Sequence, residues 1–464
     1  MVMTVIPRLV NAAAVSHLSC LHLASLSSLQ SRRWTSDGLA MKTVRRGMSE
    51  TATDVKRTSD GVGTSATRRG MSGDKKHSFQ YFWQPGSGYY GESLGRVSKV
   101  ATDICENFVL SHIDAVPVPS PTGVFTIGDY GTCDGSVSLQ LIHKIIDHLR
   151  NKHGPDLKIQ VLYEDHPSSD YNSLFKTIYG QTSYLSKFNN VFPIVCGTNF
   201  YKQCVPDNTC DVIISFIGVH FLSEESYVRC SNTIFPWRST SEEEMRAHRE
   251  AAARDWRKFL LLRAAELKQG GLLFVTQLLT ELGDNTSQSR DTNSSVTNIT
   301  DTIENGKDIY RNLDLAWNDL HTNGVITTEE FQSCTTLQAY RTLQELKDPF
   351  EDAAMSPVRQ AGLRILKGPE DFFSPCFMKT LWREKLQTDG VDDRKMFARR
   401  LVQAYRLVLD ATLRNTLEKT RTAEEQSDIM DQLYECFVER VAACNPETFQ
   451  SEPYVGRLVA QKLK

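Results

Sequence analysis

The sequence lacks any Cys-x-x-Cys pair, although 11 cysteines are scattered over its 464 residues. A structural zinc site or a dense disulfide framework needs cysteines that are grouped more tightly than this. The spacing therefore predicts reduced thiols and an intracellular protein.

The sequence also lacks an apolar run that could cross a membrane. Residues 9–31 carry no charge and are long enough to span a bilayer, which takes about 20 residues. This stretch nevertheless contains Asn11, His17, His22, Gln30 and six serines, which make it too polar for a membrane helix. We therefore expect no transmembrane segment and no membrane partner.

A large excess of either charge is missing as well, because 53 Lys and Arg residues stand against 56 Asp and Glu, a net charge of −3. This balance gives no general electrostatic case for binding nucleic acid. The charge is unevenly spread, however. Residues 1–77 hold 12 basic and 5 acidic residues, or +7, and the remaining 387 hold 41 and 51, or −10. We therefore expect two parts with different roles.

Residues 1–77 have the composition of a leader rather than of a folded domain. They are rich in Ser, Thr and Arg, show no hydrophobic periodicity, and contain no acidic residue before Asp37. Such a composition is typical of an organellar transit peptide, which would address the protein to mitochondria or plastids. A misassigned start, with Met48 or Met71 as the first residue, explains the same composition and would leave a cytoplasmic protein. Both interpretations predict a disordered segment.

Residues 78–280 show strands that alternate with helices. Continuous β-branched runs separated by helical spacing are typical of a parallel sheet buried on both faces, so the pattern predicts a doubly wound α/β core. The expected strands are 124–129, 159–163, 191–196, 212–217 and 272–276, and the expected helices are about 136–150, 170–179 and 243–268.

The C-terminal part follows a polar loop of Ser, Thr, Asn and Asp at 281–307. Residues 308–464 are mostly helical by pattern, with more helices than the faces of one sheet can hold. The expected helices are about 308–322, 328–346, 395–420 and 424–443. We interpret this part as a helical cap over the carboxyl edge of the sheet, together with the remainder of the core, because such folds bind ligands at that edge.

A glycine turn, residues 128–135 (GDYGTCDG), follows the first expected strand. Its spacing differs from the Gly-x-Gly-x-x-Gly of dinucleotide-binding sites, and Asp129 would repel a pyrophosphate, which disfavours a dehydrogenase. The turn suits a ligand with positive charge, such as the amino acid end of S-adenosylmethionine. Because the second strand ends in Glu164 and Asp165, a carboxylate is also available for ribose hydroxyls.

Five ordered motifs connect the chain with a known family. Besides the glycine turn they are 89–96 (YYGESLGR), 163–172 (YEDHPSSDYN), 198–201 (TNFY) and 215–223 (SFIGVHFLS). From about Tyr89 to the end, the sequence resembles the SABATH methyltransferases, which methylate small carboxylic acids or xanthine nitrogens. The resemblance implies a class I methyltransferase fold, S-adenosylmethionine as cofactor, a small acid as substrate, and a homodimer.

The resemblance also assigns residues to the cofactor. It places Asp165 on the ribose and Asn199 and Phe200 beside the adenine. The full set that it implies is Tyr89, Ser93, Asp129, Gly131, Gly135, Asp165, His166, Asn199 and Phe200.

The substrate side departs from the family pattern. The family holds the substrate carboxylate with a Gln and a Trp, and this chain has Arg96 and Phe221 at those positions, while His220 is kept. We therefore expect Arg96, which can bind a carboxylate bidentately, to replace the pair. An i,i+4 surface pair with Glu92 is the alternative role for Arg96. Both His220 and Phe221 could instead be ordinary buried residues.

A magnesium site is the last feature that the resemblance implies. In this chain it would use Asn208, Asp348 and Phe350, although Glu351 replaces the final Asn of the family motif.

A carboxylate with a pKa of about 4 is already ionised at neutral pH, so its methylation needs positioning and no general base. The sequence therefore predicts a carboxyl O-methyltransferase without a catalytic acid or base. Methylation of a nitrogen or another heteroatom, and cofactor binding without catalysis, are the alternatives that the departures leave open.

Overall fold

The computed structural model describes residues 90–91, 95–120, 123–280, 308–351 and 356–463. All of them belong to one compact unit, Gly73–Lys464. The expectations for the leader 1–77, the polar loop 281–307, Tyr89 and Ser93 lie outside the described residues.

A seven-stranded sheet forms the centre of this unit, in the order β3-β2-β1-β4-β5-β7-β6. The first five strands pair in parallel, whereas β7 runs antiparallel to both β5 and β6. The strands are β1 Val124–Tyr130, β2 Lys158–Asp165, β3 Val191–Gly197, β4 Cys210–Phe216, β5 Leu267–Leu278, β6 Leu363–Phe373 and β7 Tyr454–Lys462. The expected doubly wound α/β core is confirmed.

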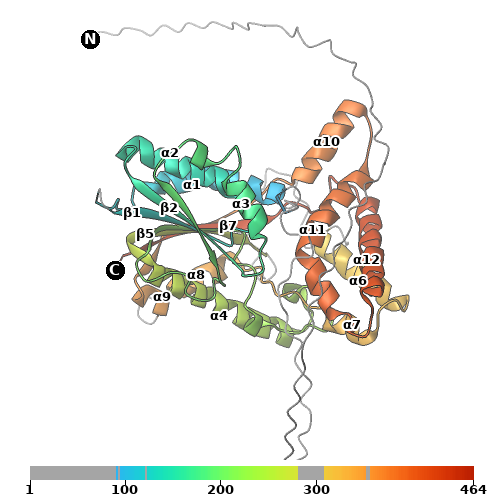
Figure 1. Ribbon diagram of the computed structural model, residues 1–464. Coiled ribbons are helices and arrows are strands. Elements are labelled where there is room, and N and C mark those ends of the chain that lie inside the picture. The colour runs from blue at the N-terminus through green and yellow to red at the C-terminus, as the bar shows by residue number, and fades with distance from the viewer. Residues whose placement is uncertain (1–89, 92–94, 121–122, 281–307, 352–355, 464) are drawn as a thin grey trace, which may run out of the picture. The chain divides into compact units, whose positions relative to one another are not determined.

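Helices cover both faces of the sheet (Figure 1). On one face lie α1 Arg96–Ile113, α2 Leu139–His153 and α3 Tyr171–Ile178, and on the other α4 Glu242–Glu266, α8 Leu343–Glu351 and α9 Pro357–Gln360. The apolar stripe of α2 shows why, since Leu141, Ile142, Ile145, Ile146 and Leu149 are all buried. Apolar residues that recur with helical spacing place one face of a helix against the sheet.

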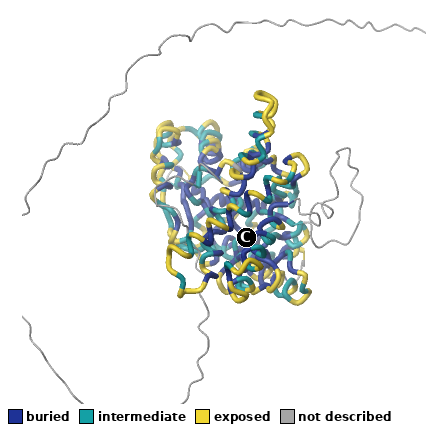
Figure 2. The backbone as a smooth tube through the Cα atoms, turned by 90° about the vertical axis from the view of Figure 1, so that its right-hand side faces the viewer, coloured by how far each residue is buried: buried dark blue, intermediate teal, exposed yellow. Residues whose placement is uncertain are grey.

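The remaining helices form a cap beside the sheet: α6 Ile309–Thr322, α7 Thr328–Ser333, α10 Phe377–Asp389, α11 Arg394–Thr416 and α12 Ala423–Ala443. The cap has a hydrophobic core of its own, which includes Trp317, Leu413 and Phe437. Figure 2 shows buried segments at the interior and exposed ones around the periphery. The expected helical cap is therefore present.

The helix expected over 328–346 is wrong in its middle part. Here α7 ends at Ser333, and α8 begins only at Leu343. Between them the backbone pairs with the segment after β4, because Leu222 N donates to Leu337 O at 2.9 Å and Ala339 N donates to His220 O at 2.8 Å. These non-local hydrogen bonds replace the helical ones and carry residues 337–340 across the carboxyl edge of the sheet.

The described residues also bear on the expectations about membrane-spanning helices and disulfides. Within the described part of the chain, no helix is both long and apolar enough to cross a membrane. The ten described cysteines form no disulfide.

Candidate active site

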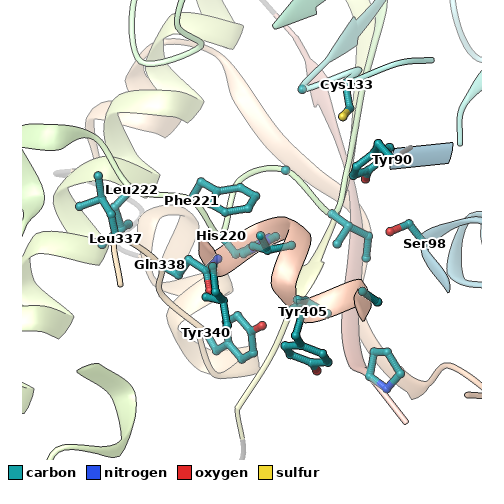
Figure 3. Close-up of a pocket in the computed structure, with 18 of the residues that line it drawn as sticks. Tyr90, Ser98, Cys133, His220, Phe221, Leu222, Leu337, Gln338, Tyr340 and Tyr405 are labelled. Atoms are coloured by element: carbon teal, nitrogen blue, oxygen red, sulfur yellow. The ribbon is translucent and has the colours of Figure 1, made fainter. Parts of the chain in front are cut away.

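A cavity of about 200 Å3 lies between the carboxyl edge of the sheet and the cap. The turn after β1, the end of β2 and the loops after β3 and β4 form one end of it. Helices α6 and α11 and the segment 337–340 form the other. Figure 3 shows Tyr90 and Cys133 at one end, Tyr340 and Tyr405 at the other, and His220 and Phe221 between them.

Seven of the expected site residues line this cavity: Gly131, Asp165, His166, Asn199, Phe200, His220 and Phe221. They come from four separate segments of the sequence, which the parallel strands bring together at one edge. Most of the expected cofactor residues therefore line the same cavity as two of the expected substrate residues.

The glycine turn brings backbone, rather than side chains, to the cavity. Gly131 has a φ of +78°, and a Cβ added there would lie 3.6 Å from Gly218 Cα and 3.8 Å from the Phe200 ring. A side chain at Gly131 would therefore be strained and would fill the gap between the β1 and β4 loops. The turn is held to β2, because Gly131 N and Thr132 N both donate to Glu164 O, at 2.9 and 3.0 Å.

Asp165 presents a buried carboxylate at the end of β2. Its Oδ2 accepts from Cys133 N at 2.6 Å, and its Oδ1 accepts from His166 N at 2.7 Å and from the Ser169 hydroxyl. Burial raises the pKa of Asp165, while these hydrogen bonds act in the opposite direction. A carboxylate has about four acceptor positions, so one remains for a ligand hydroxyl.

Asp129 and Gly135 are not among the residues that line the cavity. Asp129 is buried in β1, where its carboxylate accepts from the Ser138 hydroxyl at 2.5 Å, and burial raises its pKa to about 6. Gly135 has a φ of +73°, and a Cβ there would lie 2.8 Å from Leu174 Cδ1. The structure thus gives both residues a place in shaping the turn that carries Gly131.

The loop after β3 carries Asn199 and Phe200 and is anchored from α4. Arg263 Nη1 donates to Phe200 O at 2.8 Å, and Arg263 Nη2 donates to Lys202 O at 3.0 Å. Glu266 accepts from Cys204 N at 2.6 Å. The positions of Asn199 and Phe200 therefore depend on a charged pair that is itself outside the cavity.

This pair, Arg263 and Glu266, is fully buried, with Nε and Oε2 2.7 Å apart. Tyr130 donates its hydroxyl to Glu266 Oε2 at 2.7 Å. Glu164 lies in the same interior, and burial together with the charge of Asp165 raises its pKa well above the ordinary value. Sequence reasoning missed this pair, although an Arg and a Glu within the otherwise apolar run 259–267 are a usable signal of buried charge.

His220 occupies the middle of the cavity as a neutral ring. It is 4% exposed, and its Nδ1 has no hydrogen-bond partner among the described residues. Burial lowers the pKa of His220 to about 3, and the charge of Arg341 lowers it further in the same direction. Arg341 is itself held by Val219 O at 3.0 Å, Gln277 Oε1 at 2.8 Å and Ala252 O at 2.9 Å.

Gln338 is a cavity residue that the sequence did not reveal. It is 5% exposed and lies opposite Phe221 in a short antiparallel bridge. The structure gives its side-chain amide no hydrogen-bond partner among the described residues. An amide and an imidazole with free polar atoms therefore meet in the same part of the cavity (Figure 3).

Tyr90 is a second missed residue, one position after the expected Tyr89. It lines the cavity near Cys133. Burial raises its pKa well above the ordinary value, and the nearby Cys133 and Asp134 act in the same direction. Tyr90 is therefore a neutral phenol at the working pH.

Arg96 lies elsewhere. It is the first residue of α1, its side chain is exposed, and it is not among the residues that line the cavity. The physical reason is its position on the outward side of the first helical turn, whereas Ser98 and Ala101 face the cavity.

Two of the expected magnesium donors, Asp348 and the Phe350 carbonyl, have other hydrogen-bond partners in the structure. Within the described residues, no group of three or more His, Cys, Asp or Glu side chains could hold a metal ion. The Phe350 carbonyl accepts from the Arg359 guanidinium at 3.1 Å, and Asp348 Oδ1 accepts from Gln344 at 2.9 Å. A guanidinium on one proposed ligand disfavours a cation there.

Comparison with known protein families identifies the family to which this chain belongs. The profile of the family described as SAM dependent carboxyl methyltransferase matches residues 88–448, which is most of the chain. The chain belongs to this family.

Individual relatives are distant. A probable S-adenosylmethionine-dependent methyltransferase of Arabidopsis thaliana is 25% identical over 226 residues, which are 44% of this chain and 57% of that protein. Gibberellic acid methyltransferase 2 of Arabidopsis thaliana is 23% identical over 327 residues, 68% of this chain and 79% of that protein. The chain thus spans about half the length of the first curated relatives that it matches.

One solved structure, a loganic acid methyltransferase with SAH, has a similar fold to this member of the carboxyl methyltransferase family. The TM-score is 0.61 and the sequence identity is 17%. The match covers 82% of this chain and 97% of that one.

Proposed function

We propose that this protein transfers the methyl group of S-adenosylmethionine to the carboxylate of a small organic acid and so forms a methyl ester. The observation that carries the proposal is that one cavity holds the glycine turn and Asp165 at one end and the neutral side chains of His220 and Gln338 near its middle. Family membership supports the same reaction.

The residues of the turn end suit the cofactor. Gly131 leaves room for a ligand, Asp165 keeps one acceptor position, and Phe200 offers an aromatic face. Asn199 Oδ1 accepts from Tyr201 N at 2.8 Å, which leaves the amide hydrogens for a base. When bound, S-adenosylmethionine would supply an electrophilic methyl group on a positively charged sulfonium.

Two neutral side chains, His220 and Gln338, are proposed to orient the substrate carboxylate. Neutral donors leave the carboxylate oxygen more nucleophilic than a guanidinium would, because they form hydrogen bonds without a full opposite charge. The placement of Arg96 outside the cavity favours Gln338 in the role that the sequence suggested for Arg96. Apolar walls such as Leu222 and Leu337 exclude water from the reacting atoms.

An assay with a panel of acids tests the proposal. The panel includes gibberellic acid, indole-3-acetic acid and loganic acid, which appear in the names of similar proteins. Tritiated methyl transfer to a base-labile product supports carboxyl methylation. A base-stable product would instead identify a nitrogen or carbon acceptor, and cofactor binding without any transfer would indicate a binding protein.

Two variants, measured in the same assay, test which side chain binds the substrate carboxylate. Gln338→Leu should raise KM for the acid about 10-fold or more and leave cofactor affinity unchanged, because one charge-assisted hydrogen bond contributes about 1.5–3 kcal/mol. Arg96→Ala is the matched control and should leave KM unchanged. A rise in KM only with Arg96→Ala would return the role to Arg96.

Two further proposals concern the whole protein. We expect a homodimer, which light scattering would measure, and either an organellar or a cytoplasmic location, which fluorescent fusions of the full chain and of residues 78–464 would distinguish.

A further inference from the structure

Three tyrosines close the end of the cavity that lies away from the glycine turn. Tyr310 comes from α6, Tyr340 from the segment between α7 and α8, and Tyr405 from α11. We refer to these three residues as the tyrosine cluster. Tyr340 and Tyr405 are visible beyond His220 in Figure 3.

The hydroxyl groups of the tyrosine cluster share one hydrogen bond. Tyr310 donates its hydroxyl to that of Tyr340 at 3.1 Å, and the Tyr405 ring lies edge-on to Tyr310 with the centroids 5.9 Å apart. Among the described residues, the structure gives these hydroxyls no other partner. Three O–H groups supply three hydrogens, and the mutual bond uses one of them. The hydroxyl hydrogens of Tyr340 and Tyr405 therefore remain for a molecule in the cavity.

The rings are fixed before any ligand arrives. Trp237 stacks on Tyr340 with centroids 4.1 Å apart and an interplanar angle of 14°. Phe235 lies edge-on to Tyr310 at 5.0 Å. Burial raises the pKa of all three phenols, so each stays a neutral donor over the working pH range. Such preorganised donors lose little entropy on binding.

The remaining wall of this end is mostly apolar, with Leu401, Val408 and Leu409 of α11 among its residues, and it includes Ser451, whose buried hydroxyl has no hydrogen-bond partner among the described residues. The described lining contains no Lys or Arg, and its acidic side chains are Asp165 and Glu224. A second anionic group on a ligand would therefore be buried without a counter-charge, which is costly.

We propose that the tyrosine cluster is a subsite for an uncharged hydrogen-bonding group, such as a hydroxyl, a ketone or a ring N–H, at the end of the substrate opposite its carboxylate. The substrate class is then a monocarboxylic acid with a bulky apolar body and a polar but neutral far end. This inference rests on the proposed function, because it assumes that the carboxylate lies near His220 and Gln338.

The test uses matched acids. Benzoate, phenylacetate and phenylpropanoate provide frames of increasing length, and each carries hydrogen, hydroxyl or carboxylate at the para position. Binding to the full-length protein saturated with S-adenosylhomocysteine is measured by calorimetry, and methyl transfer is measured in parallel. Binding does not require turnover, so the subsite and the proposed reaction are tested separately.

A triple variant removes the subsite with little structural cost. Tyr310→Phe, Tyr340→Phe and Tyr405→Phe together delete three hydroxyls whose one bond among the described residues joins Tyr310 to Tyr340, so no other described group loses a partner. Tyr434→Phe is the matched control, because its hydroxyl is buried in α12 outside the cavity and has no partner among the described residues.

In the wild type we expect the hydroxylated acid of at least one frame to bind about 2- to 10-fold more tightly than the unsubstituted acid, the worth of one neutral hydrogen bond. The para-carboxylate should bind most weakly. The triple variant should lose the hydroxyl preference and keep its affinity for the unsubstituted acid, while the control keeps both.

The proposal is overturned if the triple variant retains the preference, if the wild type shows none on any frame, or if it binds the diacids equally well. The wild-type ranking decides alone if the triple variant does not fold. Preferential binding of the hydroxylated acids without methylation would retain the subsite and refute the proposed function.

Discussion

The buried pair Arg263 and Glu266 allows a quantitative test of how the cofactor end of the cavity is held. In Arg263→Met, Glu266 loses its counter-charge at a position with no solvent exposure. Breaking a buried pair in this way costs about 3–5 kcal/mol. Because whole domains are stable by only about 5–15 kcal/mol, the single variant should be severely destabilised.

The double variant Arg263→Met with Glu266→Gln removes both charges. Its amide oxygen remains an acceptor for Cys204 N, and its amide N–H can donate to the Tyr130 hydroxyl, which then accepts instead of donating. Its remaining defect is two backbone carbonyls, those of Phe200 and Lys202, without their donor, at about 1 kcal/mol each. The double variant should therefore be more stable than the single one by about 1–3 kcal/mol.

Urea denaturation of the full chain measures these free energies of unfolding, and calorimetry measures S-adenosylmethionine affinity. The double variant should bind the cofactor about 10-fold more weakly, which corresponds to 1.4 kcal/mol, because the loop that carries Phe200 loses two anchors. Arg383→Met is the control, since the pair of Arg383 with Glu447 is exposed and should contribute under about 1 kcal/mol. Equal stability of single and double variants, or unchanged cofactor affinity in both, would refute this reasoning.

Three further predictions concern single groups. Because the pKa of His220 is lowered to about 3, kcat/KM should show no inflection near pH 6.5, and an inflection that vanishes in His220→Gln would contradict a neutral donor. Arg421 and two backbone amides outweigh the burial of Glu330 and lower its pKa to about 2, so this carboxylate stabilises the fold above about pH 4.5 and loses that effect as pH falls towards 2. Glu330→Gln should therefore cost about 2–3 kcal/mol in urea denaturation at pH 7 and much less at pH 3, and an equal cost at both would be inconsistent. Tyr434→Phe removes a buried hydroxyl without a described partner and should leave stability unchanged or raise it by up to about 1 kcal/mol, so a loss of more than that would argue against its burial.

The strands of the core could be predicted because each is a short β-branched run bounded by polar residues. The expected strand 124–129 became Val124–Tyr130, and 191–196 became Val191–Gly197. Strands β6 and β7 were not foreseen, since their residues mix charged with apolar side chains and include Gly368 and Pro369. The pairing of β7 with β5 and with β6 joins segments far apart in the sequence, which local sequence patterns do not show.

The site was predictable where a residue sits at the end of a strand. Asp165 ends β2 and Asn199 lies two residues after the end of β3, so their meeting at one edge follows from parallel pairing. Gln338 could not be found in this way, because it reaches the cavity through backbone hydrogen bonds to the segment at His220. Arg96 shows the limit of a motif position, because the motif does not say which way the side chain points on its helix, and here that side chain is exposed.

The most direct test of the central claim is the chemical identity of the methylated atom. S-adenosylmethionine with an isotopically labelled methyl carbon is incubated with the protein and the best acid of the panel, and the product is examined by nuclear magnetic resonance. The account predicts a label on a carboxylate oxygen, in an ester that mild base hydrolyses. A label on nitrogen or carbon, or no transfer to any acid by a protein that binds the cofactor, would contradict it.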